Sequence, residues 1–388
     1  MSARTIAIVG AGIAGLTTAL CLARKGISSH ILEQADRLEE VGAGLQVSPN
    51  ASFVLSALGV LPALERQWIE PERIVLASGR NLRTLAWVPA GRDARDRWHR
   101  PYGILHRATL QRALLDAVAE CPLAHLHLGT PVERYDRAAI GEVIGVRPDL
   151  TIAADGVWSK MRASVPGAAT ARFSGHVAWR FMVPFEGAPD FLHPRRVIAW
   201  VGPHAHLVAY PLREAKAFNI VAIHKSASGA HGWSHPSGDA GMTLRTDKFA
   251  SWNGDIVKML QQAAVPLAWP LYQCGDGRWF DDDGLLLIGD AAHATTPFAA
   301  QGAAMAIEDA AELAEAIANA PELVTAISGF ETRRRERLRR VRSRADFNRF
   351  AYHARGPVAL ARNAVLALRS PESLAADFDW LYGYRPQI

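Results

Sequence analysis

Cysteine is scarce in this sequence, whose 388 residues contain only Cys21, Cys121 and Cys274, far apart from one another. An odd number at this spacing predicts neither a disulfide framework nor a metal site. Long hydrophobic runs are absent too, because no apolar stretch approaches the roughly 18 residues that span a bilayer. The apolar N-terminus carries spaced glycines and no cleavage-like site, unlike a signal peptide. These absences predict a cytoplasmic protein that binds no metal and no membrane.

The sequence has only a small excess of positive charge, with a net charge of +5. Apolar residues recur at roughly helical spacing within the most basic segment, at Leu338, Val341 and Phe347. We therefore interpret its arginines as the solvated face of an amphipathic helix rather than a nucleic-acid surface. A basic surface also favours anionic ligands by electrostatic steering. The arginines of this segment are Arg333, Arg334, Arg335, Arg337, Arg339, Arg340, Arg342 and Arg344.

A glycine-rich turn follows the first predicted strand. Residues 5–9 form a short β-branched run, and Gly10, Gly12 and Gly15 come before apolar residues at helical spacing. In such a strand, turn and helix, the first glycine makes the turn, the second admits a pyrophosphate, and the third lets the helix pack on the strand. Glu33 ends the next strand, where an acid can bind a ribose hydroxyl. The pattern predicts a dinucleotide site, for FAD or NAD rather than NADP.

A second strand, at residues 286–288, leads into Gly289 and Asp290 and then into small residues that continue to Met305. Small residues let the backbone lie close to a flat ligand before a helix begins. Alone, the stretch could equally be a turn before a helix; beside the N-terminal pattern it favours a cofactor site. Helices are predicted at 51–58 with Asn50 as the cap, at 108–119, from 157 to 162, at 308–318 and at 330–353.

The middle of the chain has a different pattern. Between residues 173 and 280, apolar β-type segments alternate with short loops, at 177–183, 196–201, 206–212 and 217–223. This spacing predicts a mostly antiparallel sheet. The fold class is therefore α/β, or α+β overall, with a Rossmann-like FAD-binding domain interleaved with a mostly antiparallel β-sheet substrate domain. We expect residues 1–172 and 281–388, with C-terminal helices, to form the first domain and 173–280 the second, which residues 70–100 join at its edge.

Together these motifs resemble a family, the single-component FAD-dependent aromatic hydroxylases or class A flavoprotein monooxygenases, and within it the salicylate, 3-hydroxybenzoate and 6-hydroxynicotinate hydroxylase branch. The resemblance covers essentially the whole chain. It depends on residues 10–15 with Glu33, on Asp155-Gly156 with Ser159 and Arg162, and on residues 289–310. It implies an enzyme in which NAD(P)H reduces FAD, oxygen adds to flavin C4a, and the hydroperoxide hydroxylates a small phenolic or hydroxy-carboxylate ring.

The resemblance also implies roles for individual residues. Glu33 is expected at the adenosine ribose, Arg107 at the pyrophosphate, and Asp290 at the ribityl chain or its flanking phosphate. Asp155 belongs to a motif linked to both FAD and NAD(P)H. The full expected FAD site comprises Gly10, Gly12, Ala14, Gly15, Glu33, Gly44, Leu45, Arg107, Asp155, Asp290, Gly302 and Ala303, with the two pairs Gly44-Leu45 and Gly302-Ala303 beside the isoalloxazine ring. The expected substrate contacts are Gln46, Trp179, His204, Pro297 and Phe298.

Two residues are predicted to act in catalysis. His206 and Tyr210 lie four apart on one predicted strand, so both side chains point to one face. The spacing resembles the His and Tyr pair of this branch, which predicts His206 as the base or relay for a phenol and Tyr210 as its partner. His204 is the alternative base. The alternative to any catalytic role is that His206 is a hydrogen-bonded histidine of the sheet beside a core tyrosine.

Departures from the family and rival functions complete the predictions. Residues 141–146 stand where a longer hairpin is expected, and Pro297 and Phe298 favour a salicylate-like ring over the two other rings.

A single dinucleotide fingerprint fits transient use of NADH or NADPH. The rivals are a flavin oxidase or reductase on the same fold and a non-catalytic FAD-binding protein. The expected partners are a small aromatic substrate and O2, in a monomer or homodimer.

Overall fold

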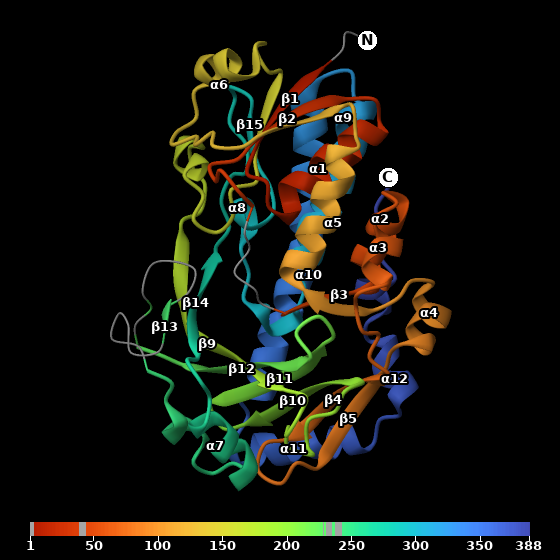
Figure 1. Ribbon diagram of the computed structural model, residues 1–388, viewed down its shortest axis with the longest axis vertical. Coiled ribbons are helices and arrows are strands. Elements are labelled where there is room, and N and C mark those ends of the chain that lie inside the picture. Colours follow the sequence, from red (N-terminus) through yellow and green to blue (C-terminus); the bar gives the residue numbers. More distant parts are fainter. Residues whose placement is uncertain (1–3, 39–43, 228, 230–234, 237–242) are drawn as a thin grey trace.

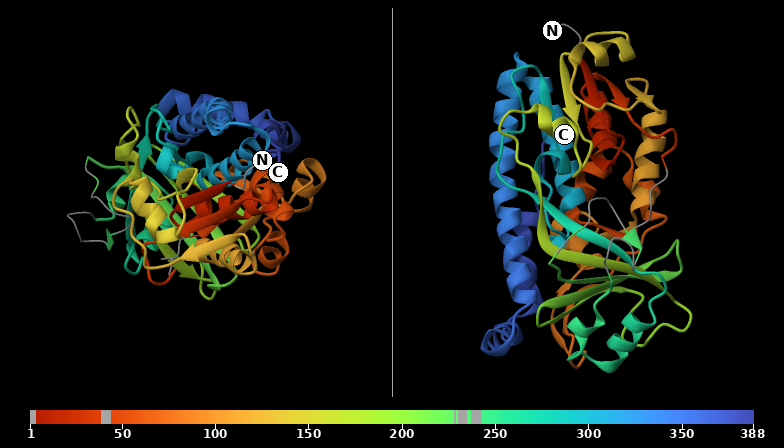
Figure 2. Two further views of the ribbon diagram at one scale, coloured as in Figure 1. Left: turned by 90° about the horizontal axis from the view of Figure 1, so that it is seen from above. Right: turned by 90° about the vertical axis from the view of Figure 1, so that its left-hand side faces the viewer.

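The computed structural model describes residues 4–38, 44–227, 229, 235–236 and 243–388. A parallel sheet lies at one end of the molecule and a larger sheet at the other, with the short ribbon that contains β3 between them (Figure 1). The long helix α10 (Leu323–Tyr352) runs beside both sheets (Figure 2). Within the described residues, no helix combines the length and the apolar character that crossing a membrane requires.

The parallel sheet has the strand order β15-β8-β1-β2-β7. Its strands are β1 (Thr5–Val9), β2 (Ser28–Leu32), β7 (Ala124–His127), β8 (Leu150–Ala153) and β15 (Leu285–Leu287), of which β1, β8 and β15 are the most buried. The helices α1 (Ile13–Arg24), α5 (Arg107–Ala119) and α9 (Gly302–Asn319) pack beside it, and α1 contacts both others. Because parallel strands end at one edge, the residues that follow β1, β2, β8 and β15 converge there.

The larger sheet has eight strands in the order β13-β14-β9-β12-β11-β10-β4-β5. All its pairs are antiparallel except β10 with β4. The strands are β4 (Arg73–Ser78), β5 (Thr84–Pro89), β9 (Ala171–Pro184), β10 (Arg196–Gly202), β11 (Ala205–Leu212), β12 (Ala217–Lys225), β13 (His235–Pro236) and β14 (Leu267–Cys274). Residues 73–89 thus join this sheet at its edge, while the domain limits near 172 and 280 stay predictions.

Each face of the larger sheet packs against a different layer. One face carries Trp179, Trp200 and Ile220, which share a core with Phe249 of the 3-10 turn Thr246–Phe249 and with Ile256 of α7 (Gly254–Gln261). The opposite face looks toward the parallel sheet. The ribbon of β3 (Gly44–Val47) and β6 (Gly103–His106) lies between the two sheets and contacts β11.

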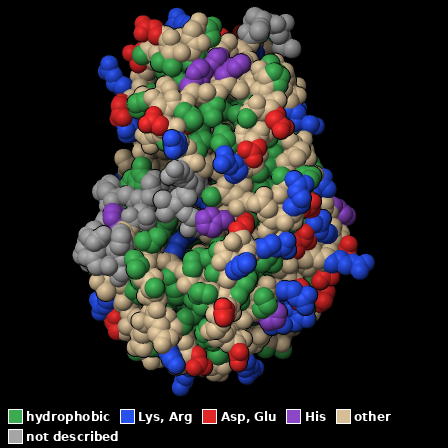
Figure 3. All heavy atoms as spheres, viewed as in Figure 1, with side chains coloured by type: hydrophobic (Ala, Val, Ile, Leu, Met, Phe, Trp, Pro, Cys, Tyr) green, Lys and Arg blue, Asp and Glu red, His purple; other side chains and the backbone are tan. Residues whose placement is uncertain are grey.

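The remaining helices are short. They are α2 (Pro49–Ala57), α3 (Leu61–Glu65), α4 (Arg92–Trp98), α6 (Arg137–Ile144), α8 (Asp290–His293), α11 (Gly356–Ala367), α12 (Pro371–Ala376) and α13 (Asp379–Tyr382), with 3-10 turns at Met161–Ser164 and Pro297–Ala299. Both α11 and α12 pack against the edge strand β5. On the face shown in Figure 3, basic and acidic side chains are interspersed, so that face offers no continuous basic surface.

Two local predictions were wrong. Ser48, not Asn50, occupies the N-cap position of α2, because the Asn50 amide bonds Glu308 and Gln301 inside the protein. The helix expected from residue 157 is only the 3-10 turn at 161–164. Residues 141–144, noted as a departure from the longer hairpin of the family, belong to the helix α6, which Asp136 caps through two backbone amides.

The arginine-rich helix is present as α10, with Arg333, Arg339 and Arg340 exposed, but part of its interpretation was wrong. The Arg334 side chain is fully buried and that of Arg337 is 6% exposed, whereas Phe347 is exposed. An amphipathic pattern predicts that the arginine side chains are exposed to solvent. Two of them are buried instead, because they pair with buried carboxylates of α9.

Candidate active site

A cavity of about 700 Å³ lies between the two sheets. One wall is the edge of the parallel sheet where its strands end, together with the first turns of α1, α5 and α9. The other wall is the inner face of β9, β11, β12 and β14. Many of the residues predicted from sequence line this space, namely Gly10, Gly12, Ala14, Glu33, Gly44, Leu45, Gln46, Arg107, Asp155, His206, Tyr210, Asp290, Pro297, Gly302 and Ala303.

The glycine turn after β1 has the geometry that a pyrophosphate needs. Gly10 has a φ of +103°, and an added Cβ would lie 2.8 Å from the carbonyl oxygen of Ala154. A Cβ at Gly15 would overlap the carbonyl oxygen of Gly10, so this glycine allows the helix to pack and lies behind the cavity. At Gly12, the N-cap of α1, a Cβ would meet open space. The positive end of a 12-residue helix therefore faces an open cradle.

Glu33 is held in place by the same turn. One of its carboxylate oxygens accepts a hydrogen bond from the backbone N–H of Ala11 at 2.8 Å, and the other accepts one from Ala35 at 3.0 Å. Gln111 of α5 is buried and donates to the carbonyl oxygen of Ala11 at 2.9 Å. The carboxylate is fixed beside the turn, and two oxygens provide further acceptor positions for hydroxyl groups.

Asp155 and Asp290 follow adjacent strands, β8 and β15, and Arg162 joins their backbones. The guanidinium of Arg162 donates to the carbonyl oxygens of Asp290 at 3.0 Å and Ala291 at 2.8 Å, and also to that of Val157 at 2.9 Å. Asp155 accepts from Lys160 N–H through Oδ2, whereas its buried Oδ1 has no hydrogen-bond partner among the described residues. Such an orphaned acceptor at a cavity wall fits a ligand hydroxyl or amide.

A second helix N-terminus faces the cavity at Gly302, the first residue of α9. A Cβ at Gly302 would meet open space, so the backbone is accessible to a flat ring. The preceding Gln301 is buried, with its side-chain amide bonded to Ser48 at 3.1 Å and to Asn50 at 3.1 Å. With the cradle at Gly12 and the acids between, these residues fit an FAD molecule extended along the wall.

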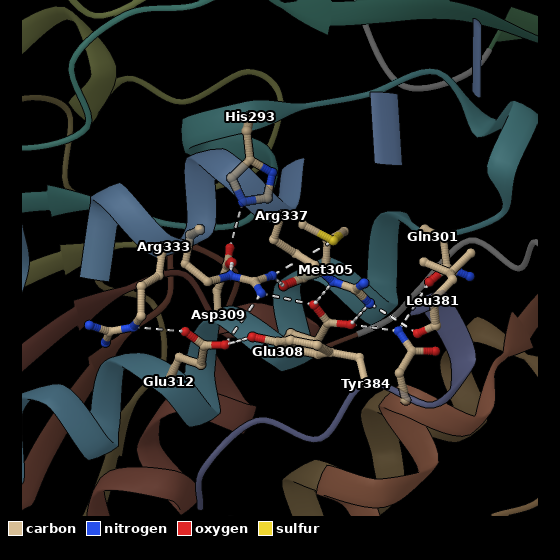
Figure 4. Close-up of polar contacts among 12 residues, drawn as sticks. His293, Gln301, Met305, Glu308, Asp309, Glu312, Arg333, Arg337, Leu381 and Tyr384 are labelled. Carbon is tan, nitrogen blue, oxygen red and sulfur yellow. Dashed lines mark hydrogen bonds and ion pairs between the residues drawn. The ribbon is translucent and has the colours of Figure 1, made fainter. Parts of the chain in front are cut away.

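A buried ionic network holds this wall from behind (Figure 4). Asp309 of α9 accepts from the backbone N–H of Gly289 at 2.9 Å and contacts His293 Nε2 at 2.6 Å. Arg334 of α10 bridges Asp309 at 2.7 Å and Glu308 at 2.9 Å. The Gly289-Asp290 turn is thereby attached to two helices.

The network continues to the end of the chain. Arg337 donates to Glu308 at 2.8 Å and to the carbonyl oxygens of Trp380 and Leu381 at 2.8 and 3.0 Å. Burial alone would raise the pKa of Asp309, but His293 and Arg334 lower it below its ordinary value. The same balance, with Arg334 and Arg337 as the cations, lowers the pKa of Glu308. Both carboxylates are therefore ionised and paired.

The opposite wall contains titratable groups without such pairing. His206 of β11 is buried, and its Nδ1 lies 2.9 Å from Nε2 of His353, which ends α10. Burial lowers the pKa of His206 well below 6.5, and His353 and His176 lower it further. Burial, with His176 and Lys225 next in importance, lowers the pKa of His353 to about 3. Both imidazoles are neutral near neutral pH.

Tyr210 lies on the same face of β11 as His206 but has another partner. Its hydroxyl donates to the carbonyl oxygen of Gly44 at 2.7 Å. Burial raises the pKa of Tyr210 to about 12, although Arg180 opposes the shift. The hydroxyl stays protonated, and the bond attaches β3 to the larger sheet.

Arg180 of β9 faces the cavity between these groups and Trp269. Its guanidinium lies 4.9 Å from the centre of the Trp269 ring. Its Nε is buried and has no hydrogen-bond partner among the described residues, and no ion pair joins it to a carboxylate there. Burial lowers the pKa of this guanidinium, as does Arg107. A half-buried cation whose Nε is buried and unpartnered calls for an anionic ligand.

Three predicted substrate residues lie outside the cavity lining. Trp179 points to the opposite face of β9, where its Nε1 donates to His224 at 3.0 Å. His204 lies in the turn before β11 with a φ of +63° and contacts Arg355. Phe298 is buried behind the wall, against the rings of His206 and His353. The structure thus brings Arg180, rather than Trp179, into the candidate site.

Several residues of the site were missed by the sequence analysis: Gln111, Arg180, His353, Arg334 and Arg337. Arg180 shares a face with His206 because their partners on β12 are two residues apart, a register that the sequence alone does not give. The adjacent acids Glu308 and Asp309 in an alanine-rich helix were a signal for buried cations. Nothing in the sequence links His353 to His206.

Comparison with known proteins bears on this cavity. A model of the family described as FAD binding domain matches residues 3–348. A 3-hydroxybenzoate 6-hydroxylase of Aquipseudomonas alcaligenes is 33% identical over 97% of both chains. The chain belongs to this family of FAD-dependent monooxygenases. FAD is its cofactor. The chain is an NAD(P)H-dependent aromatic hydroxylase, because the use of NAD(P)H is general in this family.

Further relatives agree. A 3-amino-4-hydroxybenzoate 2-monooxygenase of Streptomyces platensis is 31% identical over 98% of this chain and 96% of its own. The fold matches that of a salicylate hydroxylase solved as a substrate complex, with a TM-score of 0.78, 22% identity, and coverage of 99% of this chain and 96% of the other. The predicted fold class, an FAD-binding α/β unit with a β-sheet unit and C-terminal helices, is confirmed.

Proposed function

We propose that this monooxygenase hydroxylates a phenolic ring that carries a carboxylate, bound in the cavity between the flavin ring and the larger sheet. The observation that carries the proposal is Arg180, a cavity-lining cation with a buried, unpartnered Nε and no carboxylate partner in the described chain. A substrate carboxylate would supply the missing charge through charge-assisted hydrogen bonds. The named substrates of the relatives, 3-hydroxybenzoate and 3-amino-4-hydroxybenzoate, are phenols of this class.

The opposite end of the ring would meet His206. Two strand spacings separate β9 from β11, and the partners of Arg180 and His206 on β12 are two residues apart, which places the two residues roughly 12 Å apart at the backbone. A hydroxybenzoate fits between the two side chains. His206 is neutral because of its burial, so it can accept the phenol proton and make the ring more nucleophilic.

His353 would carry that proton onward. It accepts or donates through the 2.9 Å bond to Nδ1 of His206, and it lies at the end of α10 beside Lys225, Arg349 and His204. Two neutral imidazoles in series can pass a proton from a buried base toward solvent. Tyr210 has a positioning role, because its proton is committed to Gly44.

FAD, reduced by NAD(P)H, supplies the oxygen-transfer chemistry when bound. The protein groups proposed for FAD are Glu33 at the ribose, Arg107 and the α1 N-terminus at the pyrophosphate, and Asp290 at the ribityl chain. Asp155 belongs to the motif that we propose binds both FAD and NAD(P)H. Gly44, Leu45, Gly302 and Ala303 are proposed to lie beside the isoalloxazine ring. O2 as second substrate, a cytoplasmic location and a monomer or homodimer complete the proposal.

The deciding experiment measures NADH and NADPH oxidation by the FAD-loaded protein, with peroxide and product mass followed together. The panel holds salicylate, 3-hydroxybenzoate, 6-hydroxynicotinate, an aminohydroxybenzoate, and the matching phenols without a carboxylate. We expect a carboxylated ring to stimulate oxidation and to gain one oxygen atom. Stimulation that yields only peroxide would favour the oxidase, and FAD binding without any oxidation would favour the non-catalytic protein.

A further inference from the structure

Three histidines lie against Phe298, behind the sheet wall of the cavity. They are His176 of β9, His206 of β11 and His353, the residue that follows α10. The centres of their rings lie 5.6, 5.3 and 5.8 Å, in that order, from the centre of the Phe298 ring. His176 and His206 are each only 2% exposed. The proton path proposed above uses His206 and His353, so His176 is a buried titratable group beside the path that has no role yet.

The larger sheet places His176 on the same strand face as Arg180. Ala178 of β9 is in line with His206 across β12, because both residues pair with Ile223. Side chains alternate along a strand, so His176 and Arg180, two residues to either side of Ala178, share its face. One strand thus carries both the cation proposed for the substrate carboxylate and a histidine beside the proposed base.

A backbone carbonyl determines which nitrogen of His176 carries a hydrogen. Nδ1 of His176 lies 3.1 Å from the carbonyl oxygen of Ser174, and a carbonyl can only accept, so Nδ1 is the donor. Burial lowers the pKa of His176, although the hydrogen bond to Ser174 opposes this shift, so the ring is neutral near neutral pH. Nε2 is then an acceptor, and it is buried without a hydrogen-bond partner among the described residues. Such a nitrogen calls for a donor.

His353 is placed to be that donor. The rings of His206 and His353, which are hydrogen-bonded at 2.9 Å, have centres 5.1 Å apart. The centres of the His176 and His353 rings are only slightly farther apart, at 5.7 Å, and the rings are tilted by 32°. Lys225 and Arg349 also face His353, but these cations have no acceptor to offer it. A small movement of either ring would complete a hydrogen bond from His353 to His176.

The direction of this bond decides whether His206 can act as a base. Nδ1 of His206 faces Nε2 of His353, so Nε2 of His206 is the nitrogen left for the phenol. It can take the phenol proton only if the hydrogen of His206 is on Nδ1 and Nε2 of His353 accepts it. The hydrogen of His353 must then be on Nδ1. In the opposite arrangement His353 donates to His206, and Nε2 of His206 already carries a hydrogen.

We propose that His176 is the positioning residue that selects the active arrangement, because its Nε2 accepts the hydrogen on Nδ1 of His353. The chain of hydrogen bonds then starts at the Ser174 carbonyl and runs through His176 and His353 to His206. Each ring donates through Nδ1 to the preceding group in the chain, and the last ring presents an unprotonated Nε2 to the phenol. This inference rests on the proposed function, since it takes His206 as the base.

The first test compares two substitutions at one position of the FAD-loaded protein. His176→Phe keeps a ring against Phe298 but removes the acceptor. It should lower kcat for hydroxylation by about 3- to 10-fold, the factor that one neutral hydrogen bond contributes to an equilibrium. KM should not change, because Arg180 still binds the carboxylate. His176→Gln retains an acceptor oxygen at a similar reach and should restore most of kcat.

His224→Phe is the matched control. His224 is also a buried histidine of the larger sheet, but it accepts a hydrogen bond from Trp179 on the opposite face. Its kcat should equal that of the wild type. A second control uses the double variant His176→Phe with His353→Phe, which should be no slower than His353→Phe alone, because His176 acts only through His353.

Nitrogen-15 NMR of the histidine rings measures the arrangement without any turnover. In the FAD-loaded wild type, Nε2 of His206 should be unprotonated and Nδ1 protonated, whereas His176→Phe should show both forms of His206. The His206→Gln variant assigns the signals. A wild-type His206 protonated at Nε2 would overturn the inference, as would a His176→Gln variant as slow as His176→Phe or a further loss in the double variant. If no ring of the panel gained oxygen, the proposed function would fail, but the hydrogen position on His206 would still decide this inference.

Discussion

The two walls of the cavity bury charge in opposite ways. Behind the FAD wall, Arg334 and Arg337 are paired with Glu308 and Asp309, and each member of the network has several partners. On the sheet wall, Arg180 is a cation with no carboxylate partner among the described residues. Arg334 is fully buried and Arg180 is half-buried, so the two regions differ in exposure as well as in how each charge is compensated.

The pKa shifts show the same contrast. Burial would raise the pKa of Asp309, but cations inside the protein lower it, so the group stays charged. Burial lowers the pKa of His206, and His353 and His176 lower it further, so the group stays neutral. A fully paired network fixes the shape of the cofactor wall, whereas groups without protein partners are available to a ligand or a proton.

The largest effect should come from breaking the paired wall. Arg334→Met leaves two buried carboxylates without their shared cation, and it should lower the free energy of unfolding by about 3–5 kcal/mol. Because Asp309 also holds the Gly289 amide and His293, FAD should be lost from the purified protein. Urea unfolding and the ratio of flavin to protein absorbance measure the two effects.

Arg333→Met provides the matched control. Arg333 is the neighbouring residue, is 55% exposed, and lies 3.5 Å from Glu312. An exposed ion pair contributes only about 0–1 kcal/mol, so FAD content should not change. Equal losses in both variants would mean that the network does not hold the cofactor wall.

The second prediction concerns the unpaired wall. His206→Gln should reduce the rate of hydroxylation by about 10²–10⁴-fold, the usual contribution of a positioned base. NAD(P)H oxidation should continue, with peroxide in place of product, because the cofactor wall is unchanged. The measurement compares product and peroxide per NAD(P)H consumed.

His204→Gln distinguishes the two candidate bases. His204 lies in the exposed turn and outside the cavity lining, so hydroxylation should be unaffected. If His204→Gln rather than His206→Gln abolished product formation, the proposed proton path would be wrong.

The FAD wall could be predicted from sequence because each of its motifs is local. A glycine turn, an acid at a strand end and a run of small residues each indicate their own geometry, and parallel strands bring such ends together. The sheet wall was harder to predict. Both faces of β9 are buried, so nothing in the pattern says whether Trp179 or Arg180 faces the cavity, and a shift of one residue exchanges them.

Long-range pairing was beyond the sequence pattern. Arg334 looks like its exposed neighbours until Glu308 and Asp309 are placed opposite it by the packing of α9 on α10. His353 approaches His206 only because α10 extends past both sheets. In each case the decisive contact joins helices or strands whose relative position depends on the whole fold.

A third prediction sharpens the contrast by removing the unpaired cation. Arg180→Met should raise KM for a carboxylated ring by about 10–100-fold, because hydrogen bonds to charged groups contribute about 1.5–3 kcal/mol. For the matching phenol without a carboxylate, the KM of the variant should equal that of the wild type. A uniform loss for both rings would show that Arg180 acts on the flavin or the fold instead of the substrate carboxylate.

The smallest effect should appear in the pH dependence of stability. The titratable groups of the two walls change the free energy of unfolding over different pH ranges. The pKa of His353 is lowered to about 3 in the folded protein and should return to about 6.5 on unfolding. The unfolded chain therefore binds more protons between pH 6.5 and 3, so stability should fall as the pH falls through that window, by up to about 1.4 kcal/mol per pH unit for each such histidine.

His353→Phe should reduce this slope by about one proton, as measured by urea unfolding at a series of pH values. The carboxylates of the paired wall, whose pKa values are lowered, should remain stabilising until the pH falls below about 4. Below about pH 3, where His353 is protonated in both states, the slope should be unchanged by the substitution. If His353→Phe left the slope between pH 6.5 and 4 intact, His353 would not be the buried neutral partner of His206 on which the proton path depends.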